Sequence, residues 1–459
     1  MLPNKGCFHP KAGLVLLLLF LIASSPLFAG PADFNIDGVY EAALDLPRIL
    51  FLLKKDADGP ALEYRGSFEL NWAFLDTGAS GILLSRETVD YLQISVEPIA
   101  QYADVGVGGI EFFDVSEPLY IGTTAYDDPN PYDQDHYLML GPWRFQVNQN
   151  YASGLFAEPL DLLGTPVILG KIVVLNSRGP SKLEYFTADI REPNDSSVPK
   201  VDFNVPLRFE KYIMPKDPIN IPPLPTLAYN PVIDNITAEN RDSSFTGTWL
   251  LDTGATISII SIAQATALGL TDSNGTALIS PDFMVPIGGI GGQALIPGFQ
   301  IDNLIIPTLN GYNLIFNNAR IGVRDIGIVD EDTGEFVILD GVFGSNFFCA
   351  TMNLTTWDLS DTAFDTIIID TRRGLLGFDV NDAYPLPAGG EPAPSWPFGD
   401  LNRDYFIDLQ DLQILAEEWL NDCNWLNWNC RGGDLNSDGT INLADFAMLA
   451  QHRFESTEP

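Results

Sequence analysis

The stretch Trp72–Ser85, "WAFLDTGASGILLS", decides how this chain is interpreted. Apolar residues on both sides of Asp76 predict a buried strand that ends in an Asp-Thr-Gly turn. A carboxylate at the end of a buried strand is costly unless another group shares or stabilises its charge. A partner for Asp76 is therefore expected elsewhere in the chain.

A second copy of the stretch occurs at Trp249–Ser261, "WLLDTGATISIIS", and places Asp252 176 residues after Asp76. A glycine-rich segment follows each copy, "VGVGGIEF" in the first case and "PIGGIGGQ" in the second. Further on, "LDLLGTPVI" ends an apolar pair at Gly164 and "LDGVFGSNFF" ends one at Gly344. The repeated order and spacing predict two related halves.

Taken together, these motifs resemble those of the aspartic peptidases, in which two lobes or two identical subunits each contribute one Asp-Thr-Gly turn to a shared site. The resemblance covers about residues 34–382. Ala79 and Ala255 stand where pepsin-like enzymes usually carry Ser, and both halves have a flap-like glycine-rich segment, which favours the retropepsin-like branch. The segment "SIISIAQATALGL", ending at Leu270, looks like the short helix that follows the turn in retroviral-like members. The implied fold is all-β and bilobal with pseudo-twofold symmetry.

The resemblance implies a first lobe at residues 34–200 and a second at 201–382, joined in one monomeric peptidase unit. It also implies that Asp76 and Asp252 form a catalytic dyad. Two adjacent carboxylates share one proton, because both cannot ionise cheaply. The ionised member can then activate a water while the protonated member polarises a peptide carbonyl. The other implied catalytic residues hold the turns rigid or permit close backbone approach: Thr77, Gly78, Thr253 and Gly254.

Other interpretations of these residues stay open. A single Asp-Thr-Gly is often an ordinary turn, and a glycine-rich hairpin is often only a tight turn. A catalytically inactive peptide-binding or scaffold component of an extracellular complex would carry the same motifs. Other catalytic systems have no motif, because the three histidines are isolated in the sequence: His9, His136 and His452. We expect His136 to be a solvated loop residue.

Composition and the N-terminus indicate an exported protein. The chain has 61 Asp and Glu against 24 Lys and Arg, a net charge of -37, which argues against nucleic acid or an anionic membrane as a partner. The apolar run "LVLLLLFLIA" (14–23) follows a basic start and precedes small residues, which predicts a cleaved signal peptide at 1–29. An uncleaved anchor is the alternative. The mature chain is expected to be secreted or associated with the cell surface, and residues from Ala29 to about Arg48 form a pro-segment, a first strand, or both.

The four cysteines fit an oxidising compartment. Cys7 leaves with the signal peptide, and Cys349 lies in an apolar segment, so we expect it in the core. Cys423 and Cys430 remain for a disulfide bond.

A Pro-rich linker at 383–398, "AYPLPAGGEPAPSWPF", precedes two copies of another pattern. The copies begin "DLNRDYFIDLQDLQ" and "DLNSDGTINLADFA", and each is followed by apolar residues at helical spacing. Oxygen-bearing side chains at alternating loop positions suit calcium, with a backbone carbonyl as a further ligand. The predicted side-chain ligands are Asp400, Asn402, Asp404, Asp408 and Asp411 in the first copy, and Asp434, Asn436, Asp438, Asn442 and Asp445 in the second.

Residues 399–455 resemble a dockerin, a tandem calcium-loop-helix module, and the resemblance implies calcium as cofactor and a cohesin-like protein as partner. The last ligand is Asp, not the Glu of an EF-hand. Tyr405 replaces the turn glycine of the first loop, whereas the second loop has Gly439. A pair of acidic turns that cap two helices without metal is the alternative.

Overall fold

A computed structural model describes residues 33–452 except 107, 153–158, 178–184, 194, 196, 213–219, 273, 274, 276, 290, 291, 310, 330–335, 385–398, 400, 402–406, 422, 424–429, 431, 432 and 436–439. The predicted signal peptide and most of the predicted linker therefore lie outside the described residues. Within the described ranges, no helix has both the length and the apolar character needed to cross a membrane.

Strands dominate the described chain, as the sequence predicts, and the larger sheet has 14 strands. Its order is β14-β30-β29-β12-β13-β3-β4-β11-β5-β10-β7-β6, with β8 and β9 attached through β3. The strands are β3 (Arg48–Lys54), β4 (Asn71–Leu75), β5 (Ile82–Leu84), β6 (Tyr102–Gly106), β7 (Gly109–Val115), β8 (Leu119–Ala125), β9 (Leu138–Trp143), β10 (Gln146–Asn148), β11 (Leu162–Leu163), β12 (Ile172–Asn176), β13 (Thr187–Arg191), β14 (Phe203–Pro206), β29 (Phe364–Asp370) and β30 (Leu375–Val380).

A second sheet of 11 strands has the order β1-β22-β21-β16-β17-β26-β18-β23-β20-β19, with β15 paired to β16. Its strands are β1 (Phe34–Ile36), β15 (Arg208–Glu210), β16 (Asn230–Asn240), β17 (Ser243–Asp252), β18 (Ile259–Ile260), β19 (Phe283–Gly289), β20 (Gly292–Gln300), β21 (Asn303–Pro307), β22 (Asn313–Asn317), β23 (Arg320–Val323) and β26 (Gly341–Gly344). Small sheets contain β2 (Ala42–Ala43), β27 (Thr351–Met352) and β28 (Leu359–Ser360), and β24 (Gly327–Val329) with β25 (Phe336–Ile338).

The sequence repeat is also a repeat of elements. A short helix follows each Asp-Thr-Gly turn, α2 (Arg86–Tyr91) in the first half and α3 (Ile262–Ala267) in the second. Ser85 and Ser261 cap these helices by accepting a backbone N–H with their hydroxyl oxygen. Short 3-10 turns follow each glycine at the end of the apolar pair, Thr165–Val167 and Ser345–Phe347.

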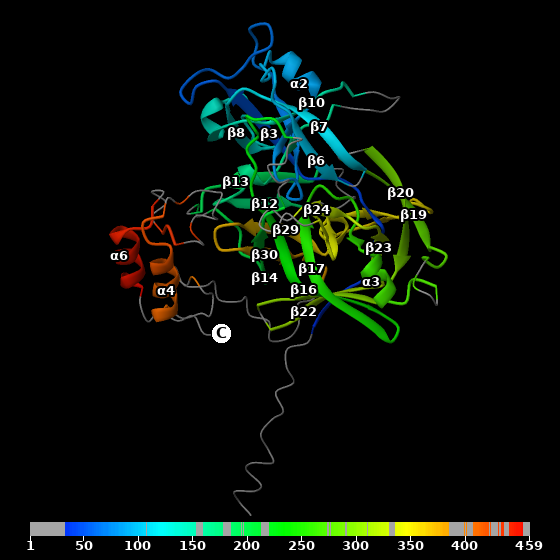
Figure 1. The fold of residues 1–459 in the computed structure, drawn as a ribbon. Helices are drawn as coiled ribbons and strands as arrows, with labels where there is room; N and C mark the ends of the chain where they lie inside the picture. The colour runs from blue at the N-terminus through cyan, green and yellow to red at the C-terminus, as the bar shows by residue number, and fades with distance from the viewer. Residues whose placement is uncertain are drawn as a thin grey trace, which may run out of the picture.

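The two halves exchange strands across the predicted boundary at residue 200. Strand β1 pairs in parallel with β22 of the second sheet, whereas β29 pairs with β12 of the first. Strands β14 and β30 extend the first sheet beyond β29. In Figure 1, β29, β30 and β14 are drawn below β12 and β13 of the first sheet. The segment before Arg48 therefore contains a first strand, one of the two roles that the sequence leaves open.

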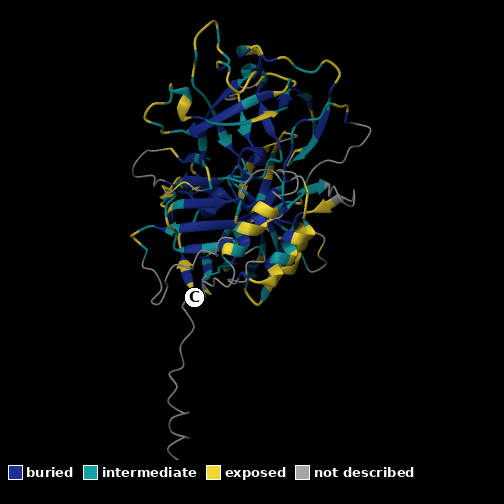
Figure 2. Ribbon diagram, turned by 90° about the vertical axis from the view of Figure 1, so that its left-hand side faces the viewer, coloured by how far each residue is buried: buried dark blue, intermediate teal, exposed yellow. Residues whose placement is uncertain are grey.

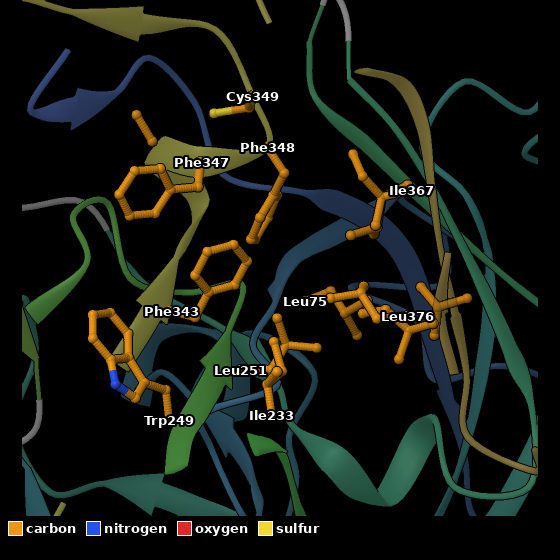
Figure 3. Close-up of a cluster of buried hydrophobic side chains, with 14 of the residues drawn as sticks. Leu75, Ile233, Trp249, Leu251, Phe343, Phe347, Phe348, Cys349, Ile367 and Leu376 are labelled. Atoms are coloured by element: carbon orange, nitrogen blue, oxygen red, sulfur yellow. The ribbon is translucent and has the colours of Figure 1, made fainter. Parts of the chain in front are cut away.

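One large hydrophobic core joins both halves. Leu75 and Leu251, the residues before the two aspartates, belong to the same buried cluster. Figure 3 shows both leucines in this cluster, with Phe343 packed beside them. The strands are mostly buried and the connecting loops exposed (Figure 2). Because the cluster spans both halves, the backbone that carries each aspartate is held from both sides.

Among its described residues, the C-terminal module contains the helices α4 (Leu409–Glu417) and α6 (Leu443–Gln451), which lie on one flank of the sheets in Figure 1. Both predicted helices are present. Not all of the apolar residues at helical spacing are buried, since Leu443 is 71% exposed and Phe446 is 39% exposed. The module buries a small core of loop, cysteine and helix residues instead: Ile407, Leu415, Cys423, Cys430, Leu435, Ile441 and Leu449. The predicted Cys423–Cys430 disulfide is formed, and Cys349 is buried and unbonded, as predicted.

Candidate functional site

The two Asp-Thr-Gly turns meet through their threonines. The Thr77 hydroxyl donates to the Leu251 carbonyl oxygen at 2.7 Å and accepts from the Thr253 N–H at 3.0 Å. The Thr253 hydroxyl makes the mirror-image bonds, to the Leu75 carbonyl oxygen at 2.6 Å and from the Thr77 N–H at 3.1 Å. Both threonines are fully buried. We call these four bonds the threonine contact, and they join strands β4 and β17 end to end across the two halves.

The same contact brings the two carboxyl groups together. The side chains of Asp76 and Asp252 hydrogen-bond to each other. Within its own turn, Oδ1 of Asp76 accepts from the N–H groups of Gly78 at 2.9 Å and Ala79 at 3.1 Å. Asp252 Oδ1 accepts in the same way from Gly254 and Ala255. Each carboxyl group is thus oriented by two backbone donors.

Burial is the main influence on the protonation of this pair. Removal from water raises the pKa of Asp76, although hydrogen bonds from Asp252, Gly78 and Ala79 oppose this shift. The pKa of Asp252 is raised well above its ordinary value of 3.8, first by burial and then by the nearby charge of Asp76. One carboxyl therefore remains protonated after the other has ionised. This is the behaviour predicted for a dyad, and the pair titrates as a unit.

Glycine is required on both sides of the pair. A Cβ atom on Gly78 would lie 2.5 Å from Cγ of Asp252, and one on Gly254 would lie 2.5 Å from Cγ of Asp76. Such distances are well below van der Waals contact. The two glycines therefore allow the carboxyl groups to approach, as the sequence predicts.

The apolar pairs that end at Gly164 and Gly344 brace the two turns. Strand β11 pairs with β4 and β5, and β26 pairs with β17 and β18. A Cβ atom on Gly164 would lie 2.0 Å from the carbonyl oxygen of Gly81, and one on Gly344 would lie 2.9 Å from that of Ala255. Gly164 and Gly344 therefore each pack against the backbone of the segment that follows an Asp-Thr-Gly turn, where only glycine fits.

Three polar residues at the turns were not found from the sequence. Asn230, on β16, donates from Nδ2 to the carbonyl oxygens of Thr77 at 3.0 Å and Gly78 at 2.9 Å. The Ser80 hydroxyl donates to Asn230 Oδ1 at 2.7 Å. In the other half Ser345 plays the corresponding part, because its hydroxyl donates to the Thr253 carbonyl oxygen at 2.9 Å. Ser345 could have been noticed because it follows the repeated Gly344, whereas no motif surrounds Asn230.

Both glycine-rich segments are β-hairpins. Strands β6 and β7 pair from Tyr102 to Gly106, and β19 and β20 pair from Phe283 to Gly289. Gly109 and Gly292 have positive φ angles of 119° and 114°, which side chains rarely adopt. The match between the halves extends to the conformation of the turn. A role as movable flaps stays a prediction.

His136 is exposed, as predicted, and it also contacts an acidic neighbour. His136 ends a 3-10 turn, and its Nδ1 lies 3.1 Å from Asp128 Oδ1. The hydrogen bond to Asp128 raises the pKa of the His136 imidazole, and the charges of Asp133 and Asp135 act in the same direction. Acidic neighbours thus favour the charged form of this surface histidine.

Five of the predicted calcium ligands lie outside the described residues: Asp400, Asn402, Asp404, Asn436 and Asp438. Within the described part of the chain, no group of three His, Cys, Asp or Glu side chains is placed to hold a metal ion. In the first loop Asp408 caps α4 and accepts from the Gln410 N–H at 2.7 Å. Asp411 is fully buried and accepts from the N–H groups of Leu401 at 2.6 Å and Asp408 at 2.8 Å.

The second loop repeats these contacts. Asn442 caps α6 and accepts from the Ala444 N–H at 2.8 Å. Asp445, also fully buried, accepts from the N–H groups of Leu435 at 2.8 Å and Asn442 at 2.9 Å, and Asp434 is 1% exposed. Buried carboxylates on an all-oxygen donor set fit a hard cation such as calcium. These residues also cap the helices, so capping and metal binding are compatible in this module.

The arrangement of the aspartates can perform acid-base chemistry without a metal. A pair of hydrogen-bonded carboxyl groups that hold one proton offers a base and an acid at adjacent positions. The backbone donors keep both carboxyl groups in place before a ligand binds, so little reorganisation is required.

Comparison with known proteins identifies the C-terminal module. Residues 398–452 match the family model described as dockerin type I domain. Domains of this family bind calcium. No curated protein sequence matches the chain.

Solved structures with a similar arrangement include basic 7S globulin from soybean, with a TM-score of 0.34, 8% identity, and coverage of 73% of this chain and 96% of that chain. Conglutin gamma, a basic 7S globulin from lupine seeds, aligns with a TM-score of 0.32 and 11% identity over 73% of this chain and 96% of its own. Likenesses of this degree carry no conclusion about activity or fold family.

Proposed function

We propose that residues 34–382 form a bilobal, retropepsin-like aspartic endopeptidase in which Asp76 and Asp252 jointly activate a water molecule. The observation that supports this most strongly is the mutual hydrogen bond of the two carboxyl groups at turns joined by the threonine contact. Two unrelated turns would have no reason to exchange reciprocal hydroxyl bonds over a sequence separation of 176 residues.

In the proposed reaction the ionised member of the pair takes a proton from the water, and the protonated member donates a hydrogen bond to the peptide carbonyl oxygen. The water oxygen adds to the carbonyl carbon, and the tetrahedral intermediate then loses the amine after the nitrogen receives a proton from the pair. Neither step forms a covalent bond to the protein. The N–H groups of Gly78, Ala79, Gly254 and Ala255 hold the carboxyl groups throughout.

The test is cleavage of a denatured protein substrate by the purified chain, with and without pepstatin. We expect Asp76→Asn and Asp252→Asn each to lower the rate by at least about a hundredfold, the scale of lost acid-base catalysis. Asp242→Asn is the matched control, because Asp242 is exposed on the turn between β16 and β17. Activity is to be followed from about pH 3 to about pH 8, which brackets carboxylate titration. A chain that is inert over this whole range contradicts the proposal.

The alternative is a catalytically inactive component that binds peptides in the same site. It has the same motifs and the same carboxylate pair, and it predicts peptide binding without product. Binding and product formation should therefore be measured on the same preparation.

We further propose that the C-terminal module tethers the protein, outside the cell, to a cohesin-like partner in a calcium-dependent manner. The dockerin type I match at residues 398–452 supports this. Titration of the full chain with calcium should give heat and a rise in thermal stability. Capture by a purified cohesin should require calcium and should be lost in Asp434→Ala, which removes a predicted ligand of the second loop.

A further inference from the structure

A half-buried carboxyl group lies on the first glycine-rich hairpin. Asp104 is in the middle of β6, and residues 220 and 221 hold the start of this strand. The backbones of Gln101 and Ile221 exchange two hydrogen bonds, and the Ala103 N–H donates to Asn220 Oδ1 at 2.8 Å. Strand β24 of the second half also lies against β6. The position of Asp104 is therefore set by both halves.

Among the described residues, the carboxyl group accepts two hydrogen bonds and forms no ion pair. Oδ1 accepts from the Val105 N–H at 2.8 Å, and Oδ2 accepts from Gln146 Nε2 at 3.0 Å. Burial raises the pKa of Asp104, and only these two hydrogen bonds oppose the shift. Within the described ranges no lysine or arginine forms an ion pair with it. A partly buried carboxylate without a basic partner among the described residues is costly, so the fold maintains it at some cost in stability.

Asp104 is linked to the aspartate site through one side chain. Gln146, on β10, is 3% exposed, and its Nε2 would lie 3.1 Å from a Cβ atom on Gly81. Gly81 is five residues beyond Asp76, at the end of the same turn. Gln146 therefore connects the Asp104 carboxyl group with the segment that follows the Asp76 turn.

We propose that Asp104 determines substrate specificity: its carboxylate binds the ammonium or guanidinium group of a lysine or arginine side chain in a polypeptide held between this hairpin and the aspartate pair. That this polypeptide is a substrate rests on the proposed function. A cation at this position would provide a counterion that the described residues do not supply, and Gln146 would keep the carboxylate in place.

The charge of the whole protein favours the same class of ligand. A net charge of -37 attracts cationic polypeptides and increases their rate of encounter. General attraction does not select a position within the peptide, however. A single charged group beside the aspartate pair would select one position in the peptide, because the attraction is strong only when the cationic side chain lies next to that group.

Peptide binding tests the proposal independently of catalysis. The full chain carrying Asp252→Asn would be titrated with fluorescent neutral peptides and with a matched set in which one lysine replaces norleucine at each position in turn. We expect one lysine position to tighten binding about tenfold or more, the scale of a partly desolvated charge pair. Adding Asp104→Asn should remove that gain, so that the variant binds the neutral and the lysine-containing peptides with similar affinity. Asn keeps an acceptor for Gln146 and nearly the same shape.

Asp242→Asn in the same background is the control for net charge, and it should keep the preference. The proposal is overturned if no lysine position tightens binding, if Asp104→Asn keeps the preference, or if Asp242→Asn removes it equally. Cleavage of the same peptides by the unmodified chain distinguishes the role of Asp104 from the proposed peptidase activity. Cleavage without lysine preference contradicts the role of Asp104 alone, whereas lysine-dependent binding without cleavage supports that role and contradicts the peptidase.

Discussion

At the scale of single residues, the hydroxyl groups of Thr77 and Thr253 matter most, because each serves as donor and acceptor between the halves. Valine has nearly the shape of threonine but no hydroxyl group. Thr77→Val should therefore leave the Leu251 carbonyl and the Thr253 N–H buried without these bonds, at a cost of about 2–4 kcal/mol in the free energy of unfolding.

Thr77→Ser is the control for this substitution, since it keeps the hydroxyl group and loses only a methyl group. Chemical denaturation measures both variants. A Thr77→Val protein as stable as Thr77→Ser would show that the threonine contact contributes little to stability.

The carboxylate pair should destabilise the fold near neutral pH. Because the pKa of Asp252 in the folded protein lies well above its ordinary value of 3.8, the folded state binds more protons than the unfolded state as the pH rises from that value. Stability is therefore complete below about pH 4 and is lost as the pH rises through the folded pKa. Asp252→Asn removes this penalty. We expect it to melt at a higher temperature than the unmodified chain at pH 7, with the difference disappearing near about pH 4. An equal difference at both pH values would contradict this explanation.

At the scale of elements, the arrangement depends on glycines where one segment passes behind another. Gly164→Ala would place a methyl group 2.0 Å from the Gly81 carbonyl oxygen and 2.4 Å from that of Ala79. These two carbonyl groups cannot move away from the methyl group without displacing the Asp76 turn. We expect a loss of at least about 3 kcal/mol, or failure to fold, measured by denaturation and soluble yield.

Gly288→Ala is the matched control, because its added methyl group would meet only Gln293 Cγ at 3.7 Å. It should change stability by about 0.5 kcal/mol or less. Equal stability of Gly164→Ala and Gly288→Ala would show that the contact between Gly164 and the Asp76 turn is less rigid than the distances indicate.

At the scale of the whole molecule, the C-terminal module contacts the first sheet. Arg372 lies at the turn between β29 and β30, and its Nη2 donates to the Leu435 carbonyl oxygen at 2.9 Å. Leu435 follows the predicted ligand Asp434, and its N–H donates to Asp445. Calcium in the second loop should therefore stabilise the module together with this contact.

Removal of calcium should destabilise the module selectively. At a free calcium concentration about 100 times Kd, the expected stabilisation is about 2.7 kcal/mol. We expect a chelator to make residues 399–452 sensitive to proteases while residues 33–384 resist digestion, as read by mass spectrometry of the fragments. Arg372→Ala should leave the calcium affinity nearly unchanged, but the module should be released earlier in the digestion than in the unmodified chain. Equal protease resistance with and without calcium would contradict the assignment.

Much of the site could be predicted from the sequence because it depends on local rules. A repeated Asp-Thr-Gly at the end of an apolar strand, a capped helix and an apolar pair before glycine each have short sequence signatures. The same holds for the two loop-helix copies of the tail, whose match to a dockerin type I domain supports the prediction. Asn230 could not be found in this way, because it contacts Thr77 across 153 residues and no motif surrounds it in the sequence.

The sequence by itself determined which residues form each turn, hairpin and helix, because these depend on neighbours a few positions apart. Only the tertiary structure decided that β1 enters the second sheet, that β29 and β30 enter the first, and that Gln146 hydrogen-bonds to Asp104. Strand pairing over such distances is selected by the fit of the whole core and by the need to satisfy every buried backbone group. No short pattern in the sequence carries that information.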